Sequence, residues 1–140
     1  MNPTVRIIHG NAPEVLGTLE DDSIQCVVTS PPYFGVVKFT DDPGELGQET
    51  TSHTYVERMA ALFRQVLRVL TPDGVLWLNL GDTFNSYAGT PGPGSSKKFL
   101  RRAEKAPRRR GFKGLLDPTR KAKDLLGIPW RVALALQDRG

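Results

Sequence analysis

Ser30-Pro31-Pro32-Tyr33 is the stretch of this chain whose residue types and spacing could do chemistry. It follows the apolar run Ile24–Thr29, which reads as a strand. Proline lacks a backbone N–H and fixes its own φ, and it pushes the preceding residue toward extended geometry. The strand therefore ends in a stiff exit that holds the Ser30 hydroxyl and the Pro31 carbonyl as hydrogen-bond acceptors beside the Tyr33 ring.

Two acceptors and an aromatic face suit the exocyclic amino group of a nucleobase. That nitrogen is a poor nucleophile because its lone pair is delocalised into the ring. Acceptors aimed at its two N–H bonds would favour a more tetrahedral nitrogen with a localised lone pair. Tyr33 could stack on the base once the base has left the duplex. The alternative for the same four residues is a plain strand stop made by the prolines.

The elements that must position these residues alternate between strand and helix. Asn11, followed three residues later by Glu14, is typical of a helix N-cap. The expected order is a strand over Val5–Gly10, a helix to about Leu19, a strand over Ile24–Thr29, a helix from Thr51 or Thr54 to about Leu70, a strand over Val75–Gly81 and a helix from about Ile128. This order predicts an α/β fold with an open, mostly parallel sheet, which binds ligands at the carboxyl ends of its strands.

Some side chains are expected to be structural. The strand over Val75–Gly81 is almost entirely apolar, which predicts burial on both faces. We expect Met59 and Phe63 in the core, together with Trp77 and the inward-facing residues of the last helix, which are Trp130, Val132, Ala133 and Leu136. Asp82 is read as a helix cap in preference to a polar wall of the site. His9 and His53 are also read as structural, and no metal site is expected.

Size and composition fit one folded domain over residues 1–140. Apolar residues make up 39% of the 140 residues, and Cys26 is the only cysteine, which excludes an internal disulfide. No apolar run approaches the roughly 20 residues of a membrane helix, and the N-terminus does not resemble a secretory signal. These features favour a cytoplasmic protein without membrane contact.

The positive charge is concentrated in one segment. The whole chain carries a net +4, yet residues 95–113 hold nine of its 19 Lys and Arg residues and only one of its 15 acidic residues. We expect residues 86–123 to form a flexible basic insertion, either a solvated loop or a contact to DNA phosphates. The candidate DNA-binding residues are Lys97, Lys98, Arg101, Arg102, Lys105, Arg108, Arg109, Arg110 and Lys113.

The tetrad and its flanks resemble the amino-methylating DNA methyltransferases, which make N4-methylcytosine or N6-methyladenine. Their signature is a [Ser/Asn/Asp]-Pro-Pro-[Tyr/Phe] tetrad at a strand end. "IIHGNAPEVLGTLEDDSIQCVVTSPPYFG" is similar to the segment that leads into it. "LGQETTSHTYVERMAALFRQVLRVLTPDGVLWLNLGDTF" and "LLGIPWRVALALQDRG" are similar to the later helix, strand and helix. The three blocks together cover about 100 residues.

The resemblance implies a site-specific enzyme of the restriction–modification type, bacterial or phage in origin. It implies a Rossmann-like fold, S-adenosylmethionine as cofactor and double-stranded DNA as partner. Ser30, Pro31, Pro32 and Tyr33 would carry catalysis, and a Ser-led tetrad favours cytosine N4 over adenine N6. Asn11 and Thr29 would lie at the cofactor, although Asn11 replaces the family's usual acidic residue and equally suits a helix cap.

One family feature is absent. The cofactor loop, Phe-x-Gly-x-Gly after a strand, does not occur, and "GTPGPG" (residues 89–94) neither follows a strand nor opens a helix. The chain fits the permuted family order, in which this loop comes late. We therefore expect the N-terminal half of such an enzyme, with a complementary C-terminal half as a possible partner. The alternatives are a catalytically inactive DNA-binding remnant and, last in rank, a methyltransferase for RNA or protein glutamine.

Overall fold

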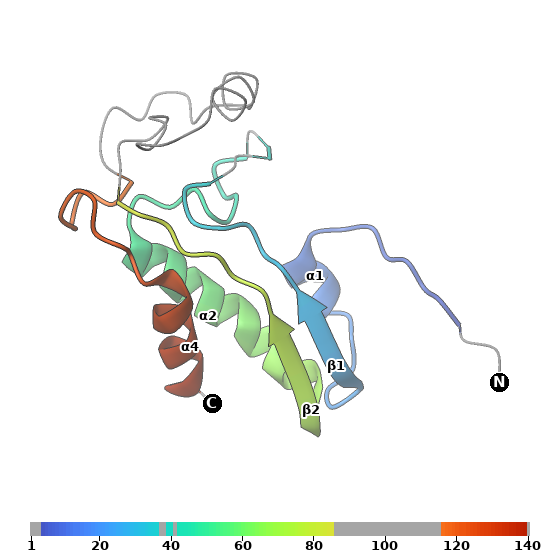
Figure 1. The fold of residues 1–140 in the computed structure, drawn as a ribbon. Coiled ribbons are helices and arrows are strands. Elements are labelled where there is room, and N and C mark those ends of the chain that lie inside the picture. Colours follow the sequence, from blue (N-terminus) through green and yellow to red (C-terminus); the bar gives the residue numbers. More distant parts are fainter. Residues whose placement is uncertain (1–3, 37–38, 41, 86–115, 140) are drawn as a thin grey trace.

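The computed structural model describes residues 4–36, 39–40, 42–85 and 116–139. Strands β1 and β2 pair in parallel, and the long helix α2 connects them (Figure 1). The elements are α1 (Ala12–Leu16), β1 (Ile24–Thr29), α2 (Ser52–Val69), β2 (Leu70–Leu78) and α4 (Ile128–Gln137). This is a small α/β arrangement, which agrees with the expected fold class.

Three expected elements form where local signals predict them. β1 has the predicted bounds, Ile24–Thr29. α2 begins after Thr51, whose side chain accepts a hydrogen bond from the backbone N–H of Thr54, as an N-cap residue does. α4 begins at Ile128 with a proline in its first turn, where the missing N–H costs little.

β2 differs from the expected strand at both ends. It begins at Leu70, directly after α2, and ends at Leu78 instead of Gly81. The pairing passes from Ile24 opposite Leu70 to Cys26 opposite Val75, so β2 carries extra residues there. A Cβ on Gly74 would lie 2.9 Å from the Thr71 carbonyl oxygen. The residues between Leu70 and Val75 therefore form an irregularity within the strand.

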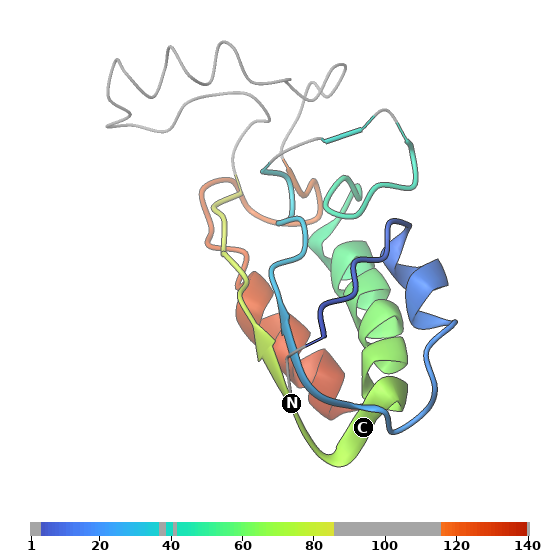
Figure 2. The same cartoon turned by 90° about the vertical axis from the view of Figure 1, so that its right-hand side faces the viewer.

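The core lies between the strands and the helices. α2 contributes Tyr55, Met59, Phe63 and Val66, and α4 contributes Ile128 and Val132. Val27, Leu76 and Leu78 of the strands pack against this cluster. Figure 2 shows α2 and α4 on the same side of the two strands. The apolar residues of one sheet face are thus covered.

The other sheet face is exposed, which corrects the prediction that the strand over Val75–Gly81 is buried on both faces. Val28 is 76% exposed and Trp77 is 68% exposed, although Trp77 was expected in the core. Alternate residues of a strand point to opposite faces, and among the described residues the helices cover only the face of Val27 and Leu76.

Trp130 and Ala133 are also exposed, contrary to expectation, with Trp130 at 75%. α4 buries Ile128 and Val132, and Leu136 is half-buried as predicted. These three positions are four residues apart and share one side of the helix. Trp130 lies two residues from Ile128, on the opposite side.

The expected strand over Val5–Gly10 does not form. Residues 4–9 carry no regular structure, and Val5 and Ile7 are exposed. Figure 1 shows this segment running away from β1. A strand is stabilised by hydrogen bonds to a neighbour, and among the described residues β1 pairs only with β2.

α1 is shorter than expected, ending at Leu16 instead of about Leu19. Asn11 occupies the N-cap position, but its side chain makes no capping hydrogen bond, so the predicted capping box is absent. Its backbone carbonyl accepts the N–H of Val15 at 2.9 Å. Gly17 follows as the C-cap residue.

No helix in the part of the chain that the structure describes is both long enough and apolar enough to cross a membrane. The same residues contain no group of three or more His, Cys, Asp or Glu side chains placed to hold a metal ion. The predicted flexible insertion, residues 86–123, lies mainly outside the described residues, which resume at residue 116.

Candidate active site

The Ser30–Tyr33 tetrad lies at the carboxyl end of β1, where it lines a pocket of about 390 Å³. Its other lining residues are Val36 and Phe39, so the walls are mainly apolar. The backbone N–H of Asn79, just after β2, donates to the Thr29 carbonyl at 2.9 Å. This bond continues the ladder and fixes the point at which the chain leaves the sheet.

The hydroxyl groups at the two ends of the tetrad meet. Ser30 Oγ and Tyr33 Oη share a hydrogen bond of 3.2 Å, in which either can donate. When Ser30 donates, the lone pairs of its oxygen remain available to an incoming N–H group. The contact therefore orients the serine hydroxyl without removing it as an acceptor.

The Tyr33 ring is packed closely against backbone. A Cβ on Gly81 would lie 2.8 Å from both Cδ2 and Cε2 of Tyr33, a distance that no real side chain tolerates. Glycine at this position lets the ring lie against the chain that leaves β2. Because Tyr33 also lines the pocket, it is held as a wall on which a planar ring could stack.

Tyr55, on the first turn of α2, holds the tetrad from the core side. Its hydroxyl donates to the carbonyl of Pro32 at 2.9 Å, and its ring lies 5.5 Å from the ring of Phe34. Burial raises the pKa of Tyr55 far above its ordinary value, with smaller contributions from the charges of Glu49 and Tyr33. The hydroxyl is therefore protonated at neutral pH and available as a donor.

A loop over residues 44–49 covers the tetrad carbonyls. Gly47 has φ +89°, and a Cβ there would lie 2.9 Å from the Tyr33 carbonyl oxygen. Its own carbonyl accepts the N–H of Gly35 at 2.8 Å. Glu49 is buried, accepts the N–H of Gly47 at 2.9 Å, and forms an ion pair of 2.6 Å with Arg58.

Sequence reasoning missed these supports. No role at the site was predicted for Tyr55, Gly47, Glu49 or Arg58. A signal was present, because a Gly-x-Glu sequence in an irregular segment combines a residue suited to positive φ with an ionisable group near the tetrad. Their meeting depends on tertiary packing, which no local pattern reports.

Asp82 caps a helix, as expected. Its Oδ1 accepts the N–H of Ile128 at 3.0 Å, at the start of α4, and the N–H of Thr83 at 2.8 Å. A carboxylate satisfies free N–H groups there and interacts favourably with the helix dipole. This contact links the exit of β2 to α4.

Asn85 and Asp117 bring together the two ends of the segment over residues 86–115. The Asn85 side-chain amide donates to the Asp117 carbonyl at 2.8 Å, and its Oδ1 accepts the Asp117 N–H at 2.9 Å. The Asp117 carboxylate accepts the N–H of Ser52 at 2.7 Å. Burial alone would raise the pKa of Asp117, but hydrogen bonds from Ser52 and Thr119 outweigh it and hold the pKa below its ordinary value.

The chain next to Asp117 lies close to the tetrad. A Cβ on Gly35 would lie 2.5 Å from Cδ2 of Leu116, and both Leu116 and Phe34 belong to the buried core. The nine candidate DNA-binding residues lie between these ends, outside the described residues. They are Lys97, Lys98, Arg101, Arg102, Lys105, Arg108, Arg109, Arg110 and Lys113.

A second pocket, of about 360 Å³, shares one lining residue with the first. Thr29, one of the two candidate cofactor residues, lines it together with Pro31. Asn11, the other candidate, does not line it, although its neighbours Gly10 and Ala12 do. Pro31 lines both pockets, so a residue of the tetrad borders each of them.

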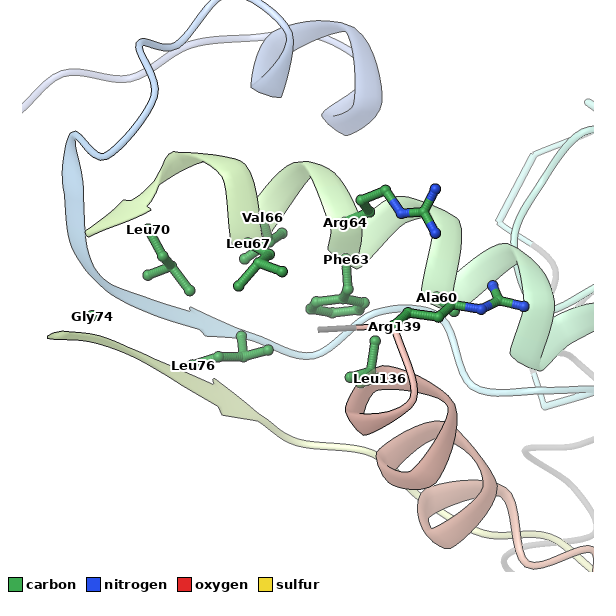
Figure 3. Close-up of a pocket in the computed structure, with 10 residues that line it drawn as sticks. All are labelled: Ala60, Phe63, Arg64, Val66, Leu67, Leu70, Gly74, Leu76, Leu136 and Arg139. Carbon is green, nitrogen blue, oxygen red and sulfur yellow. The ribbon is translucent and has the colours of Figure 1, made fainter. Parts of the chain in front are cut away.

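A smaller pocket of about 190 Å³ lies between α2, β2 and α4. The side chains of Phe63, Leu76 and Leu136 converge on it, with Arg64 and Arg139 at its edge (Figure 3). None of the tetrad residues lines it. Arg139 at its edge forms an ion pair with Glu57.

Residues 24–138 match the model of a protein family described as DNA methylase. The chain is 39% identical to the type II methyltransferase M.XycI of Xanthomonas campestris pv. cyanopsidis, over 96% of this chain and 42% of that protein. It is 38% identical to M.SmaI of Serratia marcescens, over 96% of this chain and 44% of that protein. It is 39% identical to M.SfiI of Streptomyces fimbriatus, over 99% of this chain and 28% of that protein.

The chain therefore belongs to the DNA methylase family, as the tetrad and its flanking blocks indicated. It spans less than half the length of these curated relatives.

Proposed function

We propose that this chain forms the target-base part of a DNA methyltransferase. The enzyme would transfer a methyl group from S-adenosylmethionine to the exocyclic amino group of a flipped base, cytosine N4 in preference to adenine N6. The observation that carries the proposal is the tetrad pocket at the carboxyl end of β1, which shares the lining residue Pro31 with a second pocket. A double-stranded DNA substrate and a cytoplasmic location are parts of the same proposal.

The tetrad would activate the amino nitrogen by accepting hydrogen bonds from its two N–H groups. Ser30 Oγ and the Pro31 carbonyl are the acceptors, and they localise the nitrogen lone pair that attacks the methyl carbon. The nitrogen–carbon bond forms as the carbon–sulfur bond of the donor breaks. The extra proton on nitrogen then leaves through the accepting oxygens to solvent.

Tyr33 would hold the flipped base. Its ring lines the tetrad pocket and is fixed against Gly81. Stacking between base and aromatic ring compensates part of the cost of removing the base from the duplex. The pocket volume of about 390 Å³ lies within the range of small-ligand sites.

The second pocket is our candidate for part of the cofactor site. S-adenosylmethionine, when bound, supplies a methyl group on a positively charged sulfur. The pocket fits this ligand in part, because Thr29 offers a hydroxyl and Val27, Val28 and Phe63 offer apolar walls next to Pro31. We also propose Asn11 as a cofactor residue, because its sequence neighbours Gly10 and Ala12 line this pocket.

The basic residues between positions 97 and 113 would contact DNA phosphates. Their support is limited to the described residues that flank their segment: Asn85 bonds to Asp117, and Leu116 lies against Gly35, two residues after the tetrad. Clustered Lys and Arg release counterions from DNA and give salt-dependent affinity. Binding would thus be concentrated near the base-binding pocket.

A second candidate function is DNA binding without catalysis by this chain alone. Two observations favour it: the glycine-rich cofactor loop is absent, and the relatives are more than twice as long. In this version the chain is a remnant, or one half of an enzyme that needs a complementary half.

The test uses a chimera in which this chain replaces the matching part of M.XycI. Purified chimera is incubated with DNA and S-adenosylmethionine carrying a labelled methyl group. We expect Ser30→Ala and Tyr33→Ala each to lower transfer by on the order of a hundredfold or more. Ser23→Ala is the matched control, because that hydroxyl donates to the Glu20 carbonyl and Ser23 lines neither of the two pockets. Unchanged transfer in both tetrad variants would refute these roles.

A further inference from the structure

An ion pair connects the loop over residues 44–49 to helix α2, close to the tetrad. Glu49 and Arg58 form it at 2.6 Å. The side chain of Glu49 is only 2% exposed, whereas that of Arg58 is 41% exposed. Burying a carboxylate is costly unless its partners are well placed, and an apolar residue of similar size would avoid that cost. The buried charge at Glu49 therefore favours a role beyond packing.

The Glu49 carboxylate joins α2 to the tetrad through Gly47. Its Oε2 accepts the N–H of Gly47 at 2.9 Å, and its Oε1 pairs with Arg58 of α2. The carbonyl of Gly47 in turn accepts the N–H of Gly35 at 2.8 Å, two residues after Tyr33. Consecutive contacts thus connect the helix to the chain that leaves the tetrad.

The same contacts define the place of Tyr33. A Cβ on Gly47 would lie 2.9 Å from the Tyr33 carbonyl oxygen, so the two backbones lie directly against each other. That oxygen also accepts the N–H of Val36 at 3.3 Å, which closes a turn. The Tyr33 backbone determines where its ring lies in the pocket and where its hydroxyl meets Ser30. A displaced loop would therefore move the ring and the hydroxyl together.

Arg58 holds the loop at further points. Its Nη1 donates to the carbonyl of Glu45 at 3.4 Å, and its Nη2 donates to the carbonyl of Gly44. A guanidinium can make several such bonds at once, because its donors form a rigid planar fork. Tyr55 lies three residues earlier on α2, on the same side of the helix, and donates to the Pro32 carbonyl. The helix therefore fixes the tetrad by two separate sets of contacts.

We propose that Glu49 and Arg58 are positioning residues for methyl transfer, which hold the Tyr33 ring and hydroxyl in place for the flipped base. Neither side chain lines the tetrad pocket, so both act through Gly47. This proposal rests on the proposed function, because it gives the pair a part in the same reaction. The alternative is a structural pair that stabilises the loop and has no effect on the rate.

Two substitutions of Glu49 in the chimera with M.XycI separate these alternatives. Glu49→Ala removes both contacts, whereas Glu49→Gln keeps an oxygen that can accept the Gly47 N–H. We expect kcat to fall roughly a hundredfold in Glu49→Ala and roughly tenfold in Glu49→Gln, with little change in KM for DNA, because small displacements of a reacting group have effects of this size. Glu57→Gln is the matched control and should leave kcat unchanged. It removes the carboxylate of another ion pair of α2, with Arg139, and Glu57 does not line the tetrad pocket.

Amide hydrogen exchange gives a readout that does not depend on methyl transfer. Exchange is followed by mass spectrometry in the peptide that contains Gly35 and Val36. We expect it to be on the order of tenfold faster in Glu49→Ala, because local opening of this turn becomes easier. The peptide that contains α4 should be unchanged. An equal increase in both peptides would overturn the proposal, because it would mark a general loss of stability.

Unchanged kcat in Glu49→Ala would also overturn the proposal. A loss in Glu49→Gln as large as that in Glu49→Ala would do the same, because the contact with Gly47 would then have no part in the effect. A parent chimera that methylates DNA, with kcat unaltered by Glu49→Ala, refutes the positioning role alone. A folded parent chimera that methylates nothing, with faster exchange at Gly35 in Glu49→Ala, refutes the proposed function but not the connection from Glu49 to the tetrad.

Discussion

The hydroxyl of Tyr55 donates a hydrogen bond to the carbonyl of Pro32 at 2.9 Å. Tyr55 has no exposed surface, and it belongs to the helix that connects the two strands. The middle of the tetrad is thus fixed to the core, while its two ends, Ser30 and Tyr33, line the pocket. A rigid peptide at Pro32 keeps the neighbouring Pro31 carbonyl in one orientation.

Tyr55→Phe removes this hydrogen bond and leaves the ring in place. We expect a loss of about 1 kcal/mol in the free energy of unfolding. In the chimera we expect kcat for methyl transfer to fall by roughly tenfold with little change in KM for DNA, because Tyr55 positions an acceptor and does not touch DNA. Urea denaturation and steady-state kinetics measure the two effects. A change confined to stability, with kcat unaltered, would show that the bond is only structural.

Gly47→Ala tests the loop that covers the tetrad. The position has positive φ, and the added Cβ would lie 2.9 Å from the Tyr33 carbonyl oxygen. We expect a destabilisation of about 1–3 kcal/mol, measured by thermal or urea unfolding. Gly44→Ala is the matched control: its φ is not positive and its nearest neighbour is the carboxylate of Asp42. Equal effects at the two glycines would contradict the assigned role of Gly47.

Asp117 makes stability depend on pH in the acid range. Its folded-state pKa is lowered, so its contribution is complete above the unfolded pKa of about 3.9 and is lost as pH falls through the folded value. Asp117→Asn should remove this part of the dependence. It should also cost about 1–3 kcal/mol near neutral pH, because an amide oxygen replaces only one of two acceptors.

The measurement for Asp117 is urea unfolding from pH 7 down to about 3, within the range where carboxylates titrate. The difference between wild type and Asp117→Asn should shrink as pH falls. A constant difference across the range would show that the carboxylate charge contributes nothing.

The basic segment predicts a salt-dependent interaction with DNA. Replacing Arg108, Arg109 and Arg110 with Gln should weaken DNA binding and reduce the slope of log K against log salt by about 0.9 for each phosphate that is no longer neutralised. Fluorescence anisotropy at several salt concentrations measures this slope. Arg120, Lys121 and Lys123, exposed and outside the segment, are the control for total charge when changed to Gln. Identical slopes in both triple variants would indicate a non-localised attraction.

Local signals predicted much of the fold. The bounds of β1 follow from its apolar run, the start of α2 from Thr51, and the start of α4 from Ile128 with its following proline. In each case the element is determined by residues within it or directly beside it in the sequence. The tetrad was also predicted, and it lies at a strand end as expected.

Burial could not be predicted in the same way. Trp77 and the Val5–Gly10 segment are apolar, yet neither is covered by the described residues. An apolar side chain is suited to burial, but whether it is buried depends on neighbouring elements. The described residues do not supply those neighbours here. The contact of Tyr55 with Pro32 joins residues 23 positions apart, and only the packing of α2 against the tetrad loop brings it about.

The most direct test of the central claim is the identity of the methylated nucleoside. DNA treated with the chimera and S-adenosylmethionine is digested to nucleosides and analysed by mass spectrometry against standards. The proposed function predicts N4-methyldeoxycytidine, absent after treatment with the Ser30→Ala chimera. Modification found only at carbon 5 of cytosine, or no methylated nucleoside from a folded chimera, would contradict the claim that this tetrad directs methyl transfer to an amino group.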